Sequence, residues 1–199
     1  MKICLAIAAT VYSVMLAGVV ITAHGQSAAS VQQQEVTADA DTVVTAEEAL
    51  EVSIGLRIAP VRLTYKPEQR ELVGLGSYIV NAQGGCNDCH TNPSYLPGND
   101  PFQGEPEKVN AANYLAGGTQ FGPFVSRNIT PDAKGKPAGL TFDQFLIVMR
   151  NGYDFDNAHP QIAKKLQVMP WPVYGKMRLH HLRAIYTYLT AIPHAEPAS

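Results

Sequence analysis

The chain has 199 residues, of which 46% are apolar, and its formal net charge at pH 7 is −2. This length allows one domain, or one domain with extensions. The weak net charge argues against a nucleic-acid-binding surface, because such surfaces are strongly basic. The 16 glycines and 14 prolines indicate a fold that is rich in loops.

The N-terminal segment has the layout of a secretory signal peptide. Lys2 precedes an apolar run over residues 3–23, and small residues follow. We expect cleavage near residue 25, so that residues 1–25 are the signal peptide. An uncleaved membrane anchor is the alternative, since residues 3–23 are nearly long enough to span a bilayer. Both readings predict an exported, periplasmic protein, which is membrane-tethered only if this segment is retained.

Residues 26–62 are expected to form a flexible tether and a lead-in segment before a domain over 63–195. Residues 26–48 are rich in Gln, Ala, Ser, Thr and acids and contain no aromatic residue. Such a composition buries too little apolar surface to offset the entropy of ordering. Residues 52–61 alternate in part, with apolar residues at 52, 54, 56 and 58, which predicts a strand or an extended arm.

The first predicted helix runs from Pro67 to Ala82. Its apolar stripe has helical spacing and consists of Leu72, Leu75, Ile79 and Val80. Gly74 and Gly76 are poor helix formers, so we expect another backbone to approach closely there. Gly84 and Gly85 then end the helix. Residues 91–140 are irregular, with isolated aromatic residues that need a packing partner.

Two more helices are predicted after this irregular segment. Thr141 and Gln144 form a capping box at the start of one helix, which ends near Gly152. The last helix covers residues 177–191. Between them lies an apolar segment in which prolines follow Met169 and Trp171 and stiffen the backbone.

The central motif is the pentapeptide Cys86-Asn87-Asp88-Cys89-His90, which has the C-x-x-C-H pattern of c-type haem attachment. Two thiols three positions apart can bond the two vinyl groups of one porphyrin, and the adjacent histidine then ligates the iron. We therefore expect one covalently attached haem c. Two other interpretations stay open: a thiol–disulfide centre in an exported thioredoxin-like protein, and half of a zinc site.

The second axial ligand is expected to be Met169, because the stiff loop restricts its sulfur. Met149 is expected to pack in the core and Met177 at the rim. A bis-histidine site is the alternative, with His159, His180 or His181 as the second ligand. We also expect the second ring nitrogen of His90 to donate to a backbone carbonyl, from a loop marked by Pro93 or Pro97. Arg127, Asn128 and Thr130 are candidate donors to haem propionates. Trp171 and Tyr174 are expected either at the haem edge or as plain core aromatics.

From about Gly76 to Pro193 the chain resembles class I mono-haem cytochromes c, especially bacterial exported cytochromes and the cytochrome domains of membrane-bound dehydrogenases. The resemblance is carried by the pentapeptide and by five further segments: 76–80, 115–121, 126–132, 169–171 and 182–189. It implies an all-α cytochrome c fold, with three to four helices around the covalent haem and long irregular loops. It also implies that His90 and Met169 are the axial ligands.

The resemblance predicts an electron carrier and not an enzyme, with a dehydrogenase or a terminal oxidase as redox partner. A haem enzyme of the peroxidase kind, or a gas sensor, is the alternative if the distal position is open. Two departures from the family stand out. The last helix opens with basic residues around Arg178 where the family has acids, which suggests a docking patch for an acidic partner. Dehydrogenase cytochrome subunits usually carry three haem motifs, and this sequence has one.

Overall fold

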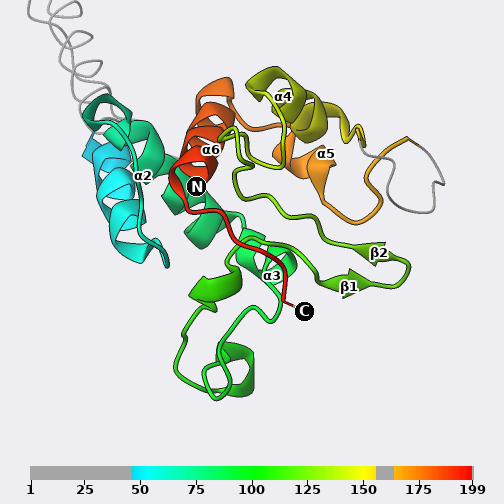
Figure 1. The fold of residues 1–199 in the computed structure, drawn as a ribbon. Helices are drawn as coiled ribbons and strands as arrows, with labels where there is room; N and C mark the ends of the chain where they lie inside the picture. Colours follow the sequence, from blue (N-terminus) through cyan, green and yellow to red (C-terminus); the bar gives the residue numbers. More distant parts are fainter. Residues whose placement is uncertain (1–45, 156–163, 199) are drawn as a thin grey trace, which may run out of the picture. The chain divides into compact units, whose positions relative to one another are not determined.

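The computed structural model describes residues 46–155 and 164–198, and these are mostly helical (Figure 1). This agrees with the predicted all-α class. The predicted signal peptide, most of the tether and His159 lie outside the described residues. Within the described ranges, no helix is both long and apolar enough to cross a membrane.

The helical elements are a helix over 46–58, η1 (Pro67–Gln69), α2 (Arg70–Tyr78), η2 (Ile79–Gln83), α3 (Cys86–His90), η3 (Pro101–Gln103), η4 (Ala111–Asn113), α4 (Phe142–Asn151), α5 (Trp171–Tyr174) and α6 (Leu179–Ala191).

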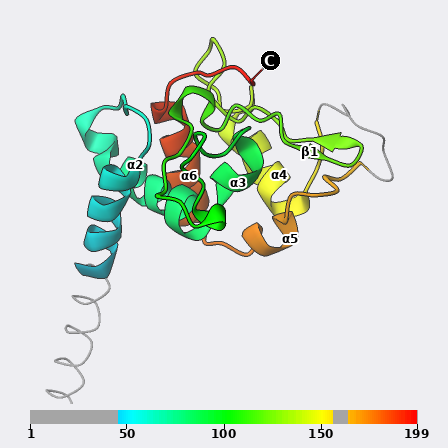
Figure 2. The same ribbon diagram turned by 90° about the horizontal axis from the view of Figure 1, so that it is seen from below.

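The lead-in segment is a helix over residues 46–58, so the prediction of a strand or extended arm is wrong. This helix packs along α2 (Figure 2). Val52 is buried against the backbone of Gly74, where a Cβ atom would lie 2.6 Å from the valine side chain. The Ser77 hydroxyl donates to the carbonyl oxygen of Gly55 at 2.7 Å. The close backbone approach expected at Gly74 is therefore made by this helix.

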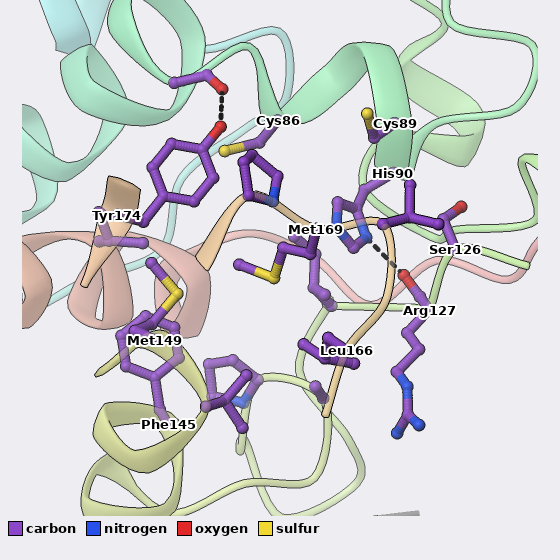
Figure 3. Close-up of a pocket in the computed structure, with 18 of the residues that line it drawn as sticks. Cys86, Cys89, His90, Ser126, Arg127, Phe145, Met149, Leu166, Met169 and Tyr174 are labelled. Carbon is purple, nitrogen blue, oxygen red and sulfur yellow. Dashed lines mark hydrogen bonds between the residues drawn. The ribbon is translucent and has the colours of Figure 1, made fainter. Parts of the chain in front are cut away.

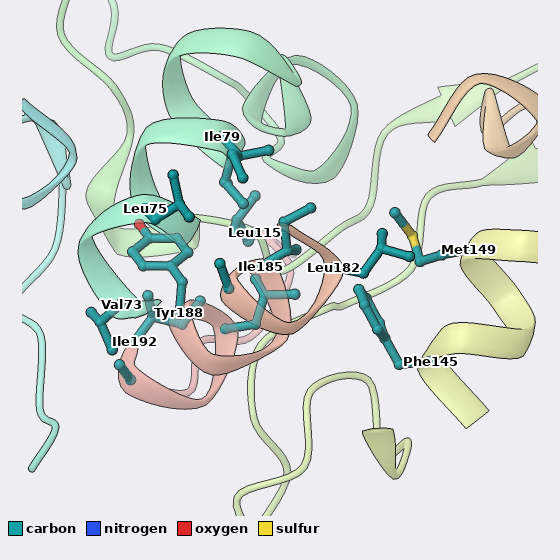
Figure 4. Close-up of a cluster of buried hydrophobic side chains, with 14 of the residues drawn as sticks. Val73, Leu75, Ile79, Leu115, Phe145, Met149, Leu182, Ile185, Tyr188 and Ile192 are labelled. Carbon is teal, nitrogen blue, oxygen red and sulfur yellow. The ribbon is translucent and has the colours of Figure 1, made fainter. Parts of the chain in front are cut away.

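The first predicted helix is confirmed as a nearly continuous run from η1 through α2 to η2. It crosses α6 at Gly76, where a Cβ atom would lie 2.0 Å from the carbonyl oxygen of Ala184. A glycine is needed at this position because any side chain would push the two helices apart. The core lies around this crossing and extends to α4, as Figure 4 shows; its largest fully buried side chains include Leu75, Tyr114, Leu182 and Tyr188.

Helix α4 begins and ends where the sequence predicts. The Thr141 hydroxyl accepts from the backbone N–H of Gln144, the Gln144 side chain returns to the Thr141 N–H, and Gly152 caps the C-terminus with a φ of 64°. Tyr186 of α6 packs against two aromatic rings of α4, Phe142 and Phe145, at centroid distances of 5.3 and 5.5 Å. These contacts hold α4 beside α6 and leave its Met149 side facing the pocket described below.

The segment over residues 91–140 is irregular, as predicted, apart from short helical turns and one small hairpin. Strands β1 (Gln120–Phe121) and β2 (Phe124–Val125) are antiparallel, with Phe121 opposite Phe124. The stiff segment after Leu166 is partly helical, since α5 forms immediately after Pro170.

Candidate functional site

One pocket brings together Cys86, Cys89 and His90 of the pentapeptide with Met169, the predicted second ligand. Its walls come from α3, the β1–β2 hairpin, α4, the segment before α5, α5 and α6. Figure 3 shows how side chains of α3, α4, α5 and the segment before α5 surround it. Most of the lining side chains are apolar. Among the described lining residues outside the pentapeptide, Arg127 and Asp154 are those with charged side chains. A flat apolar cofactor with a few polar groups matches this composition.

The two cysteines of the pentapeptide lie on the one-and-a-half turns of α3. Gly85 precedes them with a φ of 58°, a conformation that favours glycine and that turns the chain sharply from η2 into α3. Cys86 and Cys89 are three positions apart on one helical face, and both line the pocket as free thiols. Burial, followed by the neighbouring Cys89, raises the pKa of Cys86 to about 12. Burial also raises the pKa of Cys89.

His90 is held by a backbone carbonyl, as expected, but the carbonyl is that of Arg127 and not of the segment near Pro93 or Pro97. The His90 Nδ1 atom lies 2.8 Å from this oxygen. Because a carbonyl only accepts, Nδ1 carries the proton and Nε2 keeps its lone pair for a metal. Burial lowers the pKa of His90, which favours the neutral imidazole that ligates iron.

Three methionines line the same pocket. Met169 comes from the segment before α5, Met149 from α4 and Met177 from the turn before α6. Figure 3 shows the side chains of Met169 and Met149 pointing into the pocket that also receives His90. Met149 is 5% exposed and belongs to the hydrophobic core as well, in agreement with its expected packing role.

Two aromatic residues fix the segment that carries Met169. The Tyr174 hydroxyl donates to the carbonyl oxygen of Gly84 at 2.7 Å, and its ring lines the pocket. Trp171 is not among the lining residues; its ring covers Gly152 and its indole N–H donates to the carbonyl of Leu166. Trp171 therefore packs in the wall behind the pocket, while Tyr174 connects that wall to the start of α3.

Of the three candidate propionate donors, one lies at the pocket and two lie elsewhere. Arg127 lines the pocket and its guanidinium forms an ion pair with the buried carboxylate of Asp154. Asn128 instead donates to the carbonyl of Ala195 at 2.7 Å and accepts from the Thr130 hydroxyl. Asn128 and Thr130 thus tie the C-terminal segment to the domain, and only Arg127 is at the pocket.

The candidate histidine ligands at the start of α6 lie on the surface and do not line the pocket. His180 pairs with Glu48 of the 46–58 helix at 2.8 Å, and His181 contacts Arg178. The Glu48 carboxylate of the neighbouring 46–58 helix thus lies near the positive start of α6. The basic patch proposed for an acidic partner is already covered in part by this chain's own acids.

The other two interpretations of the cysteine pair find little support in the described part of the chain. Around α3 there is no βαβ unit within residues 46–155 and 164–198, whose only strands are β1 and β2. In the same ranges, no three or more His, Cys, Asp or Glu side chains group into a site that could hold a metal ion.

The fold and the pocket are consistent with a cytochrome c-like protein, and one comparison supports that relationship. The chain is 29% identical over 119 residues to the gluconate 2-dehydrogenase cytochrome c subunit of Pantoea cypripedii. The match covers 59% of this chain and 22% of the relative, so the chain spans about a fifth of the relative's length. No family model matches the chain. No solved structure matches it either.

Proposed function

We propose that this protein is an exported mono-haem c-type cytochrome that carries electrons and does not turn over a substrate. In this proposal Cys86 and Cys89 form the thioether bonds, and His90 and Met169 are the axial ligands. The observation that carries it is the convergence, in one apolar pocket, of two free thiols, a histidine with its Nδ1 already bonded, and a methionine.

The lining residues fit a covalently held haem. The apolar walls would exclude water from a bound haem, and the Nε2 atom of His90 would be available to the iron. The Arg127 guanidinium, which pairs with Asp154, would also offer N–H donors to a propionate. When bound, the haem supplies a one-electron couple, and a thioether ligand raises its reduction potential relative to a second histidine. The chain's own contribution is to orient the imidazole through Arg127 and to hold Met169 through Tyr174.

The thiol oxidoreductase alternative is disfavoured by the raised pKa of both cysteine thiols. Reactive cysteines in such enzymes have a lowered pKa, because the thiolate is the nucleophile. Burial does the opposite here and raises the pKa of Cys86 to about 12. A thiol with a raised pKa is a poor nucleophile for thiol–disulfide exchange at neutral pH.

The relative's name places it in a dehydrogenase, and we extend this only as far as a class of partner. We propose that a dehydrogenase, or a terminal oxidase, exchanges electrons with this protein in the periplasm. If the N-terminal segment is retained, the protein works at the membrane surface.

The optical spectrum of the purified holoprotein tests the ligand set. We expect a low-spin, six-coordinate haem with a sulfur-to-iron charge-transfer band. Met169→Ala should abolish this band, while the matched variants Met149→Ala and Met177→Ala should keep it. A high-spin ferric haem in the wild-type protein would favour the peroxidase-like or gas-sensing alternative, and loss of the band in Met149→Ala or Met177→Ala instead would reassign the ligand.

A further inference from the structure

A second hollow lies on the surface beside the pentapeptide, separate from the pocket. It is lined by Asp88 of α3 and by residues from Pro93 to Glu105 of the segment 93–108, here called the 93–108 loop. The loop, drawn in green, projects from the domain below α3 in Figure 1. Its lining combines two aromatic rings with carboxylates and includes Asp88, Tyr95, Asp100, Phe102 and Glu105.

The negative charge of this surface is a local feature of the sequence. Residues 71–107 contain five acids and no lysine or arginine, although the whole chain has 15 basic and 17 acidic residues. Four of the five acids belong to the loop or to α3 beside it: Asp88, Asp100, Glu105 and Glu107. Burial raises the pKa of Tyr95 to about 12, and the charges of Asp88 and Glu107 add to this effect. The hollow therefore attracts cations.

The loop is tied to itself by backbone hydrogen bonds. The N–H of Leu96 donates to the carbonyl of Lys108, and the N–H of Lys108 donates to the carbonyl of Asn99. The Tyr95 hydroxyl donates to Asp88 at 3.1 Å, which fastens the loop to α3. Such a surface loses little conformational entropy when a partner binds.

Phe102 is the most exposed large apolar side chain in the described part of the chain, at 81%. Its ring lies edge-on to Tyr95, with centroids 6.3 Å apart. Asp100 caps the short turn that carries it, by accepting from the Phe102 N–H at 2.9 Å. An exposed aromatic on an ordered turn, rimmed by polar and acidic side chains, marks a candidate protein-interaction surface.

We propose that this hollow docks a redox partner protein that has a basic face. A lysine or arginine of the partner enters between Tyr95 and the surrounding carboxylates, and Phe102 packs against the partner's surface. The proposal rests on the electron-carrier function, because Asp88 adjoins the half-buried Cys89. A partner docked here lies next to the thioether side of the haem. Opposite charge brings the partner in, and the aromatic pair holds it through apolar and cation–π contact.

The test uses a strongly basic electron-transfer protein, mitochondrial cytochrome c, as the probe. Its dissociation constant with the wild-type holoprotein is measured by calorimetry at low and high salt. We expect binding at low salt that weakens as salt is added. A triple variant should weaken low-salt binding roughly tenfold: Asp88→Asn, Asp100→Asn and Glu105→Gln. Phe102→Ser should weaken binding roughly fivefold at every salt concentration.

The matched control removes three exposed acids elsewhere, so that net charge changes equally: Glu68→Gln, Glu71→Gln and Asp143→Asn. We expect less than a twofold effect. Equal weakening in both triple variants, or no binding by the wild-type chain, overturns the docking surface. The two proposals can fail separately. If the chain carries no covalent haem but still binds through the hollow, only the electron-carrier function is overturned. If the chain carries haem but shows no hollow-specific binding, only the docking surface is overturned.

Discussion

The hydroxyl of Tyr174 donates to the carbonyl oxygen of Gly84 at 2.7 Å, although the two residues are 90 positions apart. This bond joins the turn after Met169 to the residue two positions before Cys86. The two halves of the proposed haem site are therefore held together by the protein itself, through a contact that involves neither thiol nor axial ligand.

Tyr174→Phe removes this bond and keeps the ring. We expect the free energy of unfolding to fall by about 1 kcal/mol, and the methionine–iron band to be lost at a lower temperature than in the wild type. Tyr186→Phe is the matched control, because its hydroxyl donates to the carbonyl of Leu140 at 2.9 Å and this bond does not involve the segment over residues 166–174. An equal loss of the band in both variants would show that Tyr174 acts through general stability alone.

Gly76→Ala tests the crossing of α2 and α6. The added Cβ would lie 2.0 Å from the Ala184 carbonyl oxygen, so we expect the free energy of unfolding to fall by roughly 3 kcal/mol. Urea titration followed by circular dichroism gives the value. Gly122→Ala serves as control, since nothing lies within 4 Å there and the cost of its positive φ is about 1 kcal/mol. Similar losses in the two variants would contradict a tight crossing.

Val52→Asp tests whether the 46–58 helix is part of the domain. Val52 is 5% exposed, and a carboxylate there cannot stay buried without a partner. We expect the helix to leave α2 and become open to a glutamate-specific protease. Ile58→Asp, at a position 39% exposed in the same helix, should remain resistant. Rapid cleavage of the wild-type chain at residues 47–51 would show that this helix is not held.

Asp132 predicts a pH dependence in the acidic range. Backbone N–H groups of Lys136 and Lys134 lower the pKa of its carboxyl group. A lowered folded-state pKa stabilises the protein above the unfolded value of about 3.8, and this contribution disappears as pH falls through the folded pKa. The difference in melting temperature between the wild type and Asp132→Asn should therefore be largest above pH 4 and shrink below it. A difference that stays constant over this pH range would contradict this role.

Much of the helical frame could be predicted because its signals are local. The capping box at Thr141, the stop at Gly84-Gly85 and the small residue at Gly76 each depend on a few neighbouring residues. The 46–58 helix was missed because apolar residues at 52, 54, 56 and 58 fit two periods at once. They alternate like a strand, but 52 and 56 are also one helical turn apart, and only packing against α2 decides between the two.

The residue types at the site could be predicted from the sequence, but the contacts that hold these residues in place could not. The C-x-x-C-H spacing identified the pocket side, and Met169 does line the same pocket. The acceptor for His90 is a backbone carbonyl 37 positions away, and no side-chain pattern marks it. The pairing of His180 with Glu48 was equally hidden, because Glu48 was expected to belong to the flexible tether over residues 26–48.

Covalent haem attachment is tested most directly by whether haem stays on the polypeptide after denaturation. The full chain is produced with a c-type haem maturation system, unfolded, and separated on a denaturing gel that is stained for haem and followed by intact-mass measurement. We predict one haem per chain on the denatured wild-type polypeptide and none when Cys86 and Cys89 are both replaced by alanine. A wild-type chain that releases all its haem, or never acquires any, would contradict covalent attachment through Cys86 and Cys89.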